Sequence, residues 1–187
     1  MNDFFIASNR VLKVDGFKVR QVLVKELDLF SEHASQVKSA LKTENYSDEV
    51  LIKLFDSHAV AVLKSLSIVC CSTPENLLEL KNEQIFMLVK AMLVVNHAYF
   101  KVDKRHRREE ASNVDAESKW FDTFQTLISA GHSHESIMNM TYGAFTAYLK
   151  AAQKQYNMKL RAISNIIRCA QHADSKGFER FIDQLKI

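Results

Sequence analysis

The spacing of apolar residues changes within the first forty residues of the chain. From Phe4 to Val24 apolar residues recur at short, strand-like intervals on both sides of Asp15-Gly16. Asp-Gly between such runs is the strongest short signal for a two-stranded hairpin. From about Lys25 to Lys42 they recur every three or four positions, which is the period of an amphipathic helix. The sequence therefore predicts a small β-hairpin followed by a helix.

Further helix signals follow up to residue 100. Ser47 precedes two acidic residues, a pattern typical of a helix N-cap with acids in the first turn. Pro74 marks the start of a short helix. A longer helix, for which we expect Asn82 as the cap, has apolar residues around nearly its whole circumference. It should be the central core helix of a domain that spans residues 1–100.

The next segment divides the predicted domains. Residues 101–114 contain almost nothing that a core could bury, and they are basic first and acidic afterwards, so we interpret them as a charged linker. Residues 115–187 return to helical spacing and form a second, small helical domain. Gly at four and Pro at one are too few for a turn-rich β protein. The predicted fold is mainly α, with a small N-terminal β-hairpin, a helical bundle and a second small helical domain.

A long helix that begins after Thr141 carries the candidate binding surface. Apolar residues seven positions apart keep one face aligned for about six turns. We favour packing of this face on the Trp120–Ile128 helix within its own domain; an oligomer seam or a groove for a partner are the alternatives. If the face binds a partner, the residues on it and at its edges are Tyr148, Leu149, Tyr156, Ile163 and Ile166.

The sequence offers few candidate catalytic or metal-binding residues. His132 and His134 stand beside Glu135, but zinc ligands on a helix are usually four apart and no second cluster follows. Cys70 could pair with a histidine, yet its apolar neighbours favour a buried thiol. Phosphate-binding glycine loops and hydrolase motifs are missing. We therefore expect a protein that is not an enzyme, with no catalytic residues, no metal site and no cofactor.

Charge and targeting signals limit the expected partners and the expected location of the protein in the cell. The net charge is +3, and residues 101–108 form the one basic cluster that the sequence suggests. No aromatic residues interleave with this cluster, so nucleic-acid binding is not favoured; a small nucleic-acid-associated regulator that uses it remains the alternative function. The chain has no signal peptide and no apolar run near 18 residues. Its three cysteines are interpreted as buried, reduced thiols. We expect a cytoplasmic protein without a membrane partner.

Both predicted domains resemble one protein family. The first segment, with its β-like start and a final helix that ends in Asn96 and Tyr99-Phe100, resembles the N-terminal domain of tail assembly chaperones from long-tailed bacteriophages and prophages. The second segment resembles the downstream domain of that family. The matching pattern is an apolar helix, a Gly-His-Ser turn, a Met-Thr step and a Phe-bearing helix, here Gly131, His132, Ser133, Ile137, Met140, Thr141 and Phe145.

The resemblance implies a function in virion assembly. In this family the short form is the first domain and the long form carries both, made in many such phages by a ribosomal frameshift. Its members keep the tape measure protein soluble, recruit tail tube subunits and leave before the virion is complete. The resemblance therefore implies a non-enzymatic chaperone in the cytoplasm of the host bacterium. Its partners would be the tape measure and tail tube proteins, with self-association as a further possibility.

The linker interpretation can be checked by proteolysis. Limited trypsin digestion should cut first between about residues 101 and 115, because this segment has no apolar periodicity and is rich in Lys and Arg. Two stable fragments on a gel, identified by mass, are the expected result. Stable resistance in this segment would contradict the linker interpretation.

Overall fold

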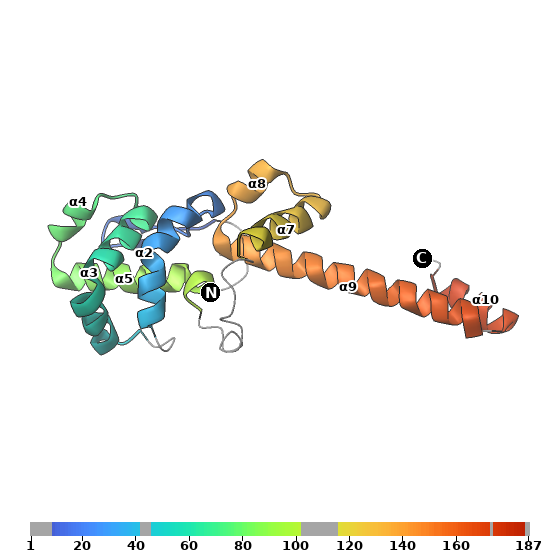
Figure 1. Ribbon diagram of the computed structural model, residues 1–187. Helices are drawn as coiled ribbons and strands as arrows, with labels where there is room; N and C mark the ends of the chain where they lie inside the picture. Colours follow the sequence, from blue (N-terminus) through green and yellow to red (C-terminus); the bar gives the residue numbers. More distant parts are fainter. Residues whose placement is uncertain (1–8, 42–45, 102–115, 173, 186–187) are drawn as a thin grey trace. The chain divides into compact units, whose positions relative to one another are not determined.

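A computed structural model describes residues 9–41, 46–101, 116–172 and 174–185 (Figure 1). Its contacts divide the chain into an N-terminal unit, residues 1–148, and a C-terminal unit, residues 149–187. The described secondary structure is one small hairpin, a 3-10 turn and a series of helices. The predicted mainly α fold with an N-terminal β-hairpin is thus confirmed.

The hairpin is built around the Asp-Gly pair. Strands β1 (Leu12–Val14) and β2 (Phe17–Val19) are antiparallel. Asp15 and Gly16 both have positive φ, 47° and 85°, as the favoured two-residue hairpin turn requires. The Asp15 carboxylate also accepts a hydrogen bond from the Gln84 side chain. This bond ties the turn to a helix far along the chain.

Three helices form the core of the N-terminal unit. They are α2 (Leu27–Ala40), α3 (Asp48–Cys70) and α5 (Asn82–Val95); α2 packs on α3, and α3 packs on α5. Each buries one apolar face, which contributes roughly 1.5–3 kcal/mol for each fully buried aliphatic or aromatic side chain. The largest fully buried residues of these helices are Phe30, Leu51, Leu66, Leu88, Met92 and Leu93. Helix α5 is thus a core helix, as predicted, but the central helix of the three is α3, which packs on both α2 and α5.

Short elements connect these helices and follow them. The 3-10 turn η1 (Val24–Glu26) leads into α2, and α4 (Pro74–Leu78) begins where Thr73 accepts a hydrogen bond from the Asn76 backbone amide at 3.3 Å. The N-cap of α5 is Lys81, so Asn82 is its first helical residue and not the expected cap. The remaining helices are α6 (His97–Phe100), α7 (Ala116–Ser129), α8 (His134–Met138), α9 (Tyr142–His172) and α10 (Ser175–Leu185).

The segment Arg20–Val24, which ends at the first residue of η1, connects distant parts of the N-terminal unit. On one side, the Val22 amide donates to Oδ1 of Asn96 at 2.8 Å, and Nδ2 of Asn96 donates to the Arg20 carbonyl at 3.2 Å. On the other side, the Val24 amide donates to the Met140 carbonyl, and the Tyr142 amide donates to the Val22 carbonyl, both at 2.9 Å. The segment thereby joins the end of α5 to the start of α9.

The Arg20 side chain connects the segment Arg20–Val24 to α3. Its guanidinium donates two hydrogen bonds to the Glu26 carboxylate, at 2.6 and 2.8 Å, and one to the Ile68 carbonyl at 3.0 Å. Burial lowers the pKa of Arg20, but its bonds to Glu26 and Cys71 more than offset this effect, so the pKa lies above the ordinary value. Arg20 is therefore a permanent positive charge with partners on two elements.

The contacts divide the chain at a different place from the predicted boundary. Helices α7 and α8 and the first residues of α9 belong to the N-terminal unit, which continues to Tyr148. They are held there by the backbone bonds of Val22 and Val24, which connect residues more than a hundred positions apart. Nearly all of the predicted linker, residues 101–114, lies outside the described residues.

The role of Asn96 can be measured. Replacement of Asn96 by Leu should lower the free energy of unfolding by roughly 3 kcal/mol, because the Val22 amide and the Arg20 carbonyl would lose a buried partner. Chemical denaturation of the purified chain measures this change. Asn76→Leu is the matched control, since Asn76 is exposed. Equal stability of the two variants would show that Asn96 does not hold the segment.

Candidate functional site

The start of α9 is anchored in the N-terminal unit. Oγ1 of Thr141 accepts a hydrogen bond from the Ala144 amide at 3.2 Å, which caps the helix. Phe145 is buried, and its ring lies 5.9 Å from the rings of both Trp120 and Phe124 on α7. The expected packing of α9 on the Trp120–Ile128 helix is thus present at Phe145.

Further along α9, in the C-terminal unit, the apolar face is exposed. We define the α9 stripe as six residues of one helix face, the first two seven positions apart and the rest at alternating spacings of four and three: Leu149, Tyr156, Leu160, Ile163, Ile167 and Ala170. Tyr156 is 63% exposed, Ile163 is 51% exposed, and Leu149 is half-buried. From the sequence we favoured packing of this face on the Trp120–Ile128 helix. In the described structure that packing does not extend to the stripe, which corrects the interpretation.

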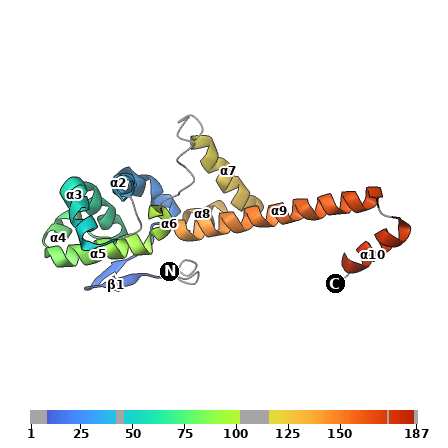
Figure 2. The ribbon, with the colours of Figure 1, turned by 90° about the horizontal axis from the view of Figure 1, so that it is seen from below.

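Helix α10 does not cover the stripe either. A cavity of about 430 Å³ separates it from the last turns of α9 and is lined by Asn165, Arg168, Cys169, His172 and Phe181. At about 100° of rotation per residue, these positions of α9 face away from the stripe. Figure 2 shows α10 following α9 after a turn. In the part of the chain that the structure describes, the stripe has no covering element.

The other predicted partner-binding residues fall into different settings. Ile166 is exposed at one edge of the stripe. Tyr148 is exposed too, but it belongs to the N-terminal unit, where its ring lies 5.0 Å from the His132 ring. Of the predicted partner-binding residues, Tyr148, Tyr156, Ile163 and Ile166 are thus exposed, whereas Leu149 is partly covered.

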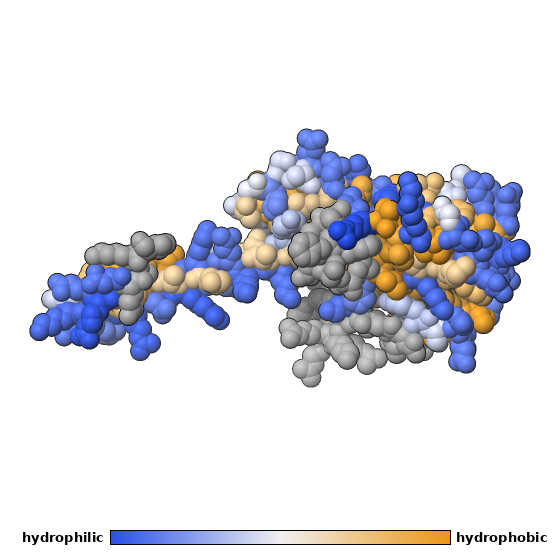
Figure 3. All heavy atoms as spheres, turned by 180° about the vertical axis from the view of Figure 1, so that it is seen from behind, coloured by the Kyte–Doolittle hydropathy of each residue, from blue (hydrophilic) through white to orange (hydrophobic). Residues whose placement is uncertain are grey.

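The charge of α9 was not predicted from the sequence. Residues 142–172 include no Asp or Glu, but they include five basic residues, namely Lys150, Lys154, Lys159, Arg161 and Arg168. Residues 149–187 carry eight Lys and Arg against three Asp and Glu, a net charge of +5, whereas residues 1–148 carry 17 against 19, a net charge of −2. A count of charges for each helix would have found this asymmetry. Figure 3 shows hydrophilic residues over much of the visible surface of α9.

A second apolar surface lies within the N-terminal unit. A groove of about 350 Å³ is lined by residues of η1, α2, α6, α7, α8 and α9, among them the aromatic residues Tyr99, Trp120, Phe124 and Tyr142. Burial, together with the neighbouring Tyr142, raises the pKa of Tyr99 to about 12, so this phenol is neutral at physiological pH. The groove presents rings but few charges, which favours an apolar ligand or peptide side chain.

The residues that carry the family resemblance have structural roles here. Gly131, with φ of 99°, ends α7, and the His132 amide donates to the Leu127 carbonyl at 3.1 Å. Ser133 caps α8 by accepting from the Ser136 amide at 3.1 Å. Phe100 is buried against Phe30. Together with Asn96, Thr141 and Phe145, these residues build the part of the N-terminal unit that holds the start of α9.

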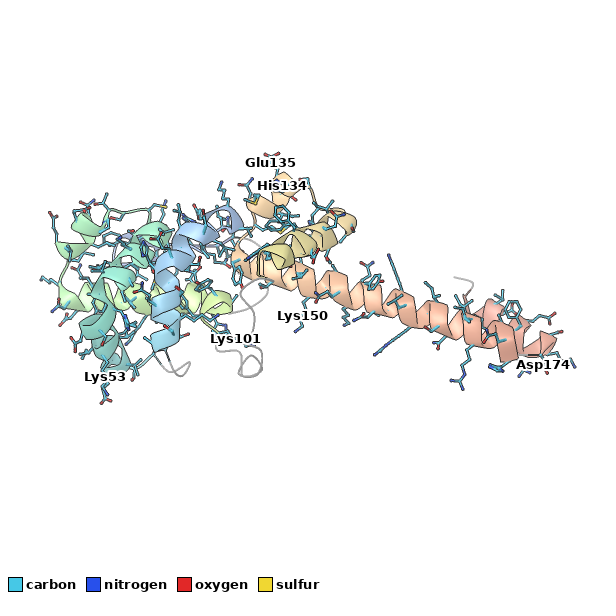
Figure 4. The ribbon with its side chains drawn as sticks, in the orientation of Figure 1. Lys53, Lys101, His134, Glu135, Lys150 and Asp174 are labelled. Atoms are coloured by element: carbon cyan, nitrogen blue, oxygen red, sulfur yellow. The ribbon has the colours of Figure 1, made fainter. Side chains whose placement is uncertain are left out.

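The histidine and cysteine candidates do not gather into a site. His134 and Glu135 lie in the first turn of α8 (Figure 4), and His134 makes an edge contact with Phe124. Among the described residues, no group of three or more His, Cys, Asp or Glu side chains could hold a metal ion. None of the described helices is both long and apolar enough to cross a membrane.

The two adjacent cysteines differ from each other, which corrects their interpretation as a buried pair. Cys70 is buried at the end of α3, and this burial raises its pKa to about 12. Cys71 is exposed, adopts positive φ at the helix C-cap, and accepts a hydrogen bond from Nε of Arg20 at 3.3 Å. The apolar sequence around the pair indicated burial but not where the helix ends.

Comparisons with protein-family models, with curated proteins and with solved structures find no match to this chain. A function therefore has to be inferred from the surfaces described above and from the sequence resemblance.

Alkylation of the native protein should distinguish the two cysteines. At pH 8, iodoacetamide should modify Cys71 at least about tenfold faster than Cys70, because a pKa near 12 leaves very little thiolate at Cys70. Mass spectrometry of the Cys70→Ser and Cys71→Ser variants separates the two rates. Similar rates would show that Cys70 is accessible in solution.

Proposed function

We propose that this chain is a tail assembly chaperone of a long-tailed phage or prophage, acting in the cytoplasm of its bacterial host. It binds the tape measure protein, keeps it soluble and helps to recruit tail tube subunits. The chain acts by binding and catalyses no reaction. The proposal combines the sequence resemblance with the surfaces that the described residues expose.

The uncovered α9 stripe is the observation that carries this proposal. A tape measure protein is a long helical chain, so before assembly its own apolar stripes are exposed to water. An exposed helical stripe of about three heptads can cover such a helix by side-by-side packing. Isolated exposed apolar residues are ordinary, but an aligned row on one helix face is typical of an interaction surface.

The anchoring of α9 supports the same role. Thr141 and Phe145 hold the first turn of the helix in the N-terminal unit, and the helix continues without a break to His172. A stripe on a continuous helix keeps its side chains in register, so the client does not have to order them on binding. The N-terminal unit thus supplies the folded support, and α9 supplies the contact surface.

The tail tube protein is the second proposed partner. The groove lined by Tyr99, Trp120 and Phe124 is a separate apolar surface on the N-terminal unit. Two surfaces on different units would let one chain hold a client and recruit a subunit. Self-association through α9 is the remaining use of the stripe.

A nucleic-acid-associated regulator is the alternative from another class. The observation that favours it is the basic character of α9, which has five Lys and Arg and no acidic residue. The basic stretch at residues 101–108 lies outside the described residues except for Lys101. A tape measure gene directly downstream would support the chaperone, whereas a position beside a promoter as a repressor would support the regulator.

The chaperone proposal predicts a face-specific loss of client binding. Tyr156→Glu and Ile163→Glu should each weaken binding of the tape measure protein by about 30-fold, because a charge would enter an apolar contact. Stability should change by less than about 0.5 kcal/mol, since both side chains are exposed. Co-expression with the tape measure protein, followed by a solubility assay and pull-down, measures the effect.

Met158→Glu is the matched control. Met158 is 61% exposed on the same helix, but at about 100° per residue it faces away from the stripe. The tape measure protein should stay soluble with this variant. If all three variants keep it soluble at the wild-type level, α9 is not the client site.

A further inference from the structure

The basic residues of α9 take two different positions around the stripe. In the heptad register of a packed helix pair, at 3.5 residues per turn or about 103° per residue, Lys150 and Lys159 lie roughly 70–80° from the centre of the stripe, one at each edge. In the same register, Lys154, Arg161 and Arg168 lie about 130° away, on the outer side of the helix. All five side chains are exposed, and Figure 4 labels Lys150 on α9. Among the described residues, neither Lys150 nor Lys159 forms an ion pair.

We infer that the occupant of the α9 stripe is an amphipathic helix with acidic residues along the edges of its apolar face. In a helix pair with an apolar seam, the residues at the seam edges face those of the partner and decide which partners are accepted. Lys150 and Lys159 occupy these edges, and α9 has no carboxylate to balance them. A partner with Glu or Asp at the matching positions supplies the missing charge.

Charge disfavours a second copy of this chain as the occupant. Two α9 helices would bring together edges that carry Lys150 and Lys159 with no acidic residue between Tyr142 and His172. Like charges at the edges of a helix pair destabilise it. The C-terminal units, each with a net charge of +5, would also repel each other as they approach.

The shape of the stripe disfavours an anionic lipid surface and a nucleic acid. A helix that lies in a membrane interface buries a broad apolar face, whereas this stripe takes about two positions per heptad and is interrupted by Gln153. A nucleic acid is bound through clustered positive charge and does not require an apolar row. The combination of a narrow seam with cationic edges is typical of helix-to-helix recognition.

The outer cations have a separate effect. Lys154, Arg161 and Arg168 are too far around the helix to meet a partner that packs on the stripe. They raise the positive potential of the whole helix, which increases the rate of encounter with an acidic partner and is weakened by salt. Edge and outer cations should therefore respond differently to the same charge change.

The experiment uses the full chain and synthetic peptides. The probe is a labelled peptide of about four heptads with Ile and Leu on the seam and Glu at both edges; the control peptide carries Lys at the edges. Repulsion between its own Glu residues keeps the probe from pairing with itself. Fluorescence anisotropy should detect binding of the Glu peptide and at least about tenfold weaker binding of the Lys peptide.

Two double variants test where the charge acts. Lys150→Glu with Lys159→Glu should weaken binding of the Glu peptide by at least about tenfold and strengthen that of the Lys peptide. Lys154→Glu with Arg161→Glu makes the same charge change on the outer side of the helix. This double variant should weaken binding of the Glu peptide by less than about threefold at physiological salt. Unchanged helix content by circular dichroism shows that both variants fold.

Several results would overturn the inference. These are an equal loss in both double variants, equal binding of the Glu and Lys peptides, or concentration-dependent dimerisation through the stripe. The inference would also fail if the chain bound phosphatidylglycerol vesicles or a DNA duplex as tightly as it binds the Glu peptide.

The inference depends on the proposed function only in that the partner is a protein helix. If the Glu peptide binds as expected but the wild-type chain does not keep a tape measure protein soluble, the inference stands and the proposed function fails. If the tape measure protein stays soluble but the Glu peptide does not bind, the inference fails alone.

Discussion

The backbone polar groups of Arg20–Val24 have to be paired once the segment is buried, and the N-terminal unit is organised around that requirement. The side chain of Asn96 forms hydrogen bonds with the Val22 amide and the Arg20 carbonyl. The backbone groups of Met140 and Tyr142 form hydrogen bonds with the Val24 amide and the Val22 carbonyl. An unpaired buried amide or carbonyl costs about 1–3 kcal/mol. The same four bonds therefore close the helical core and fix the place where α9 starts.

The start of α9 then determines which of its residues can serve as a surface. Gly143, Ala144 and Phe145 are buried, so the first turn belongs to the folded frame. Beyond Leu149 the helix keeps its apolar spacing, but in the described structure its side chains are exposed. A helix whose first turn is packed and whose later turns are uncovered can present an aligned stripe without contributing it to the core of its own chain.

Charge adds selectivity to that stripe. The whole chain has a net charge of only +3, but residues 149–187 carry +5 and residues 1–148 carry −2. Apolar contact provides most of the affinity in helix packing, whereas edge charges reject partners of the same sign. A surface that selects one helical partner needs both features, because an apolar stripe alone would bind any exposed apolar helix.

The sequence by itself determined the local elements of this protein. Asp15-Gly16 predicted the hairpin turn, because this turn requires positive φ at both positions and Asp and Gly tolerate it. The three-to-four spacing of apolar residues specified the helices, and both signals depend only on neighbouring residues. The apolar run around Cys70 and Cys71 indicated burial but could not show that the helix ends between a buried and an exposed thiol. Only the tertiary structure decided that residues 116–148 join the N-terminal unit and that the α9 stripe stays exposed. These outcomes depend on hydrogen bonds between Val22 or Val24 and residues more than a hundred positions away, and periodicity along a chain does not report which distant segments meet.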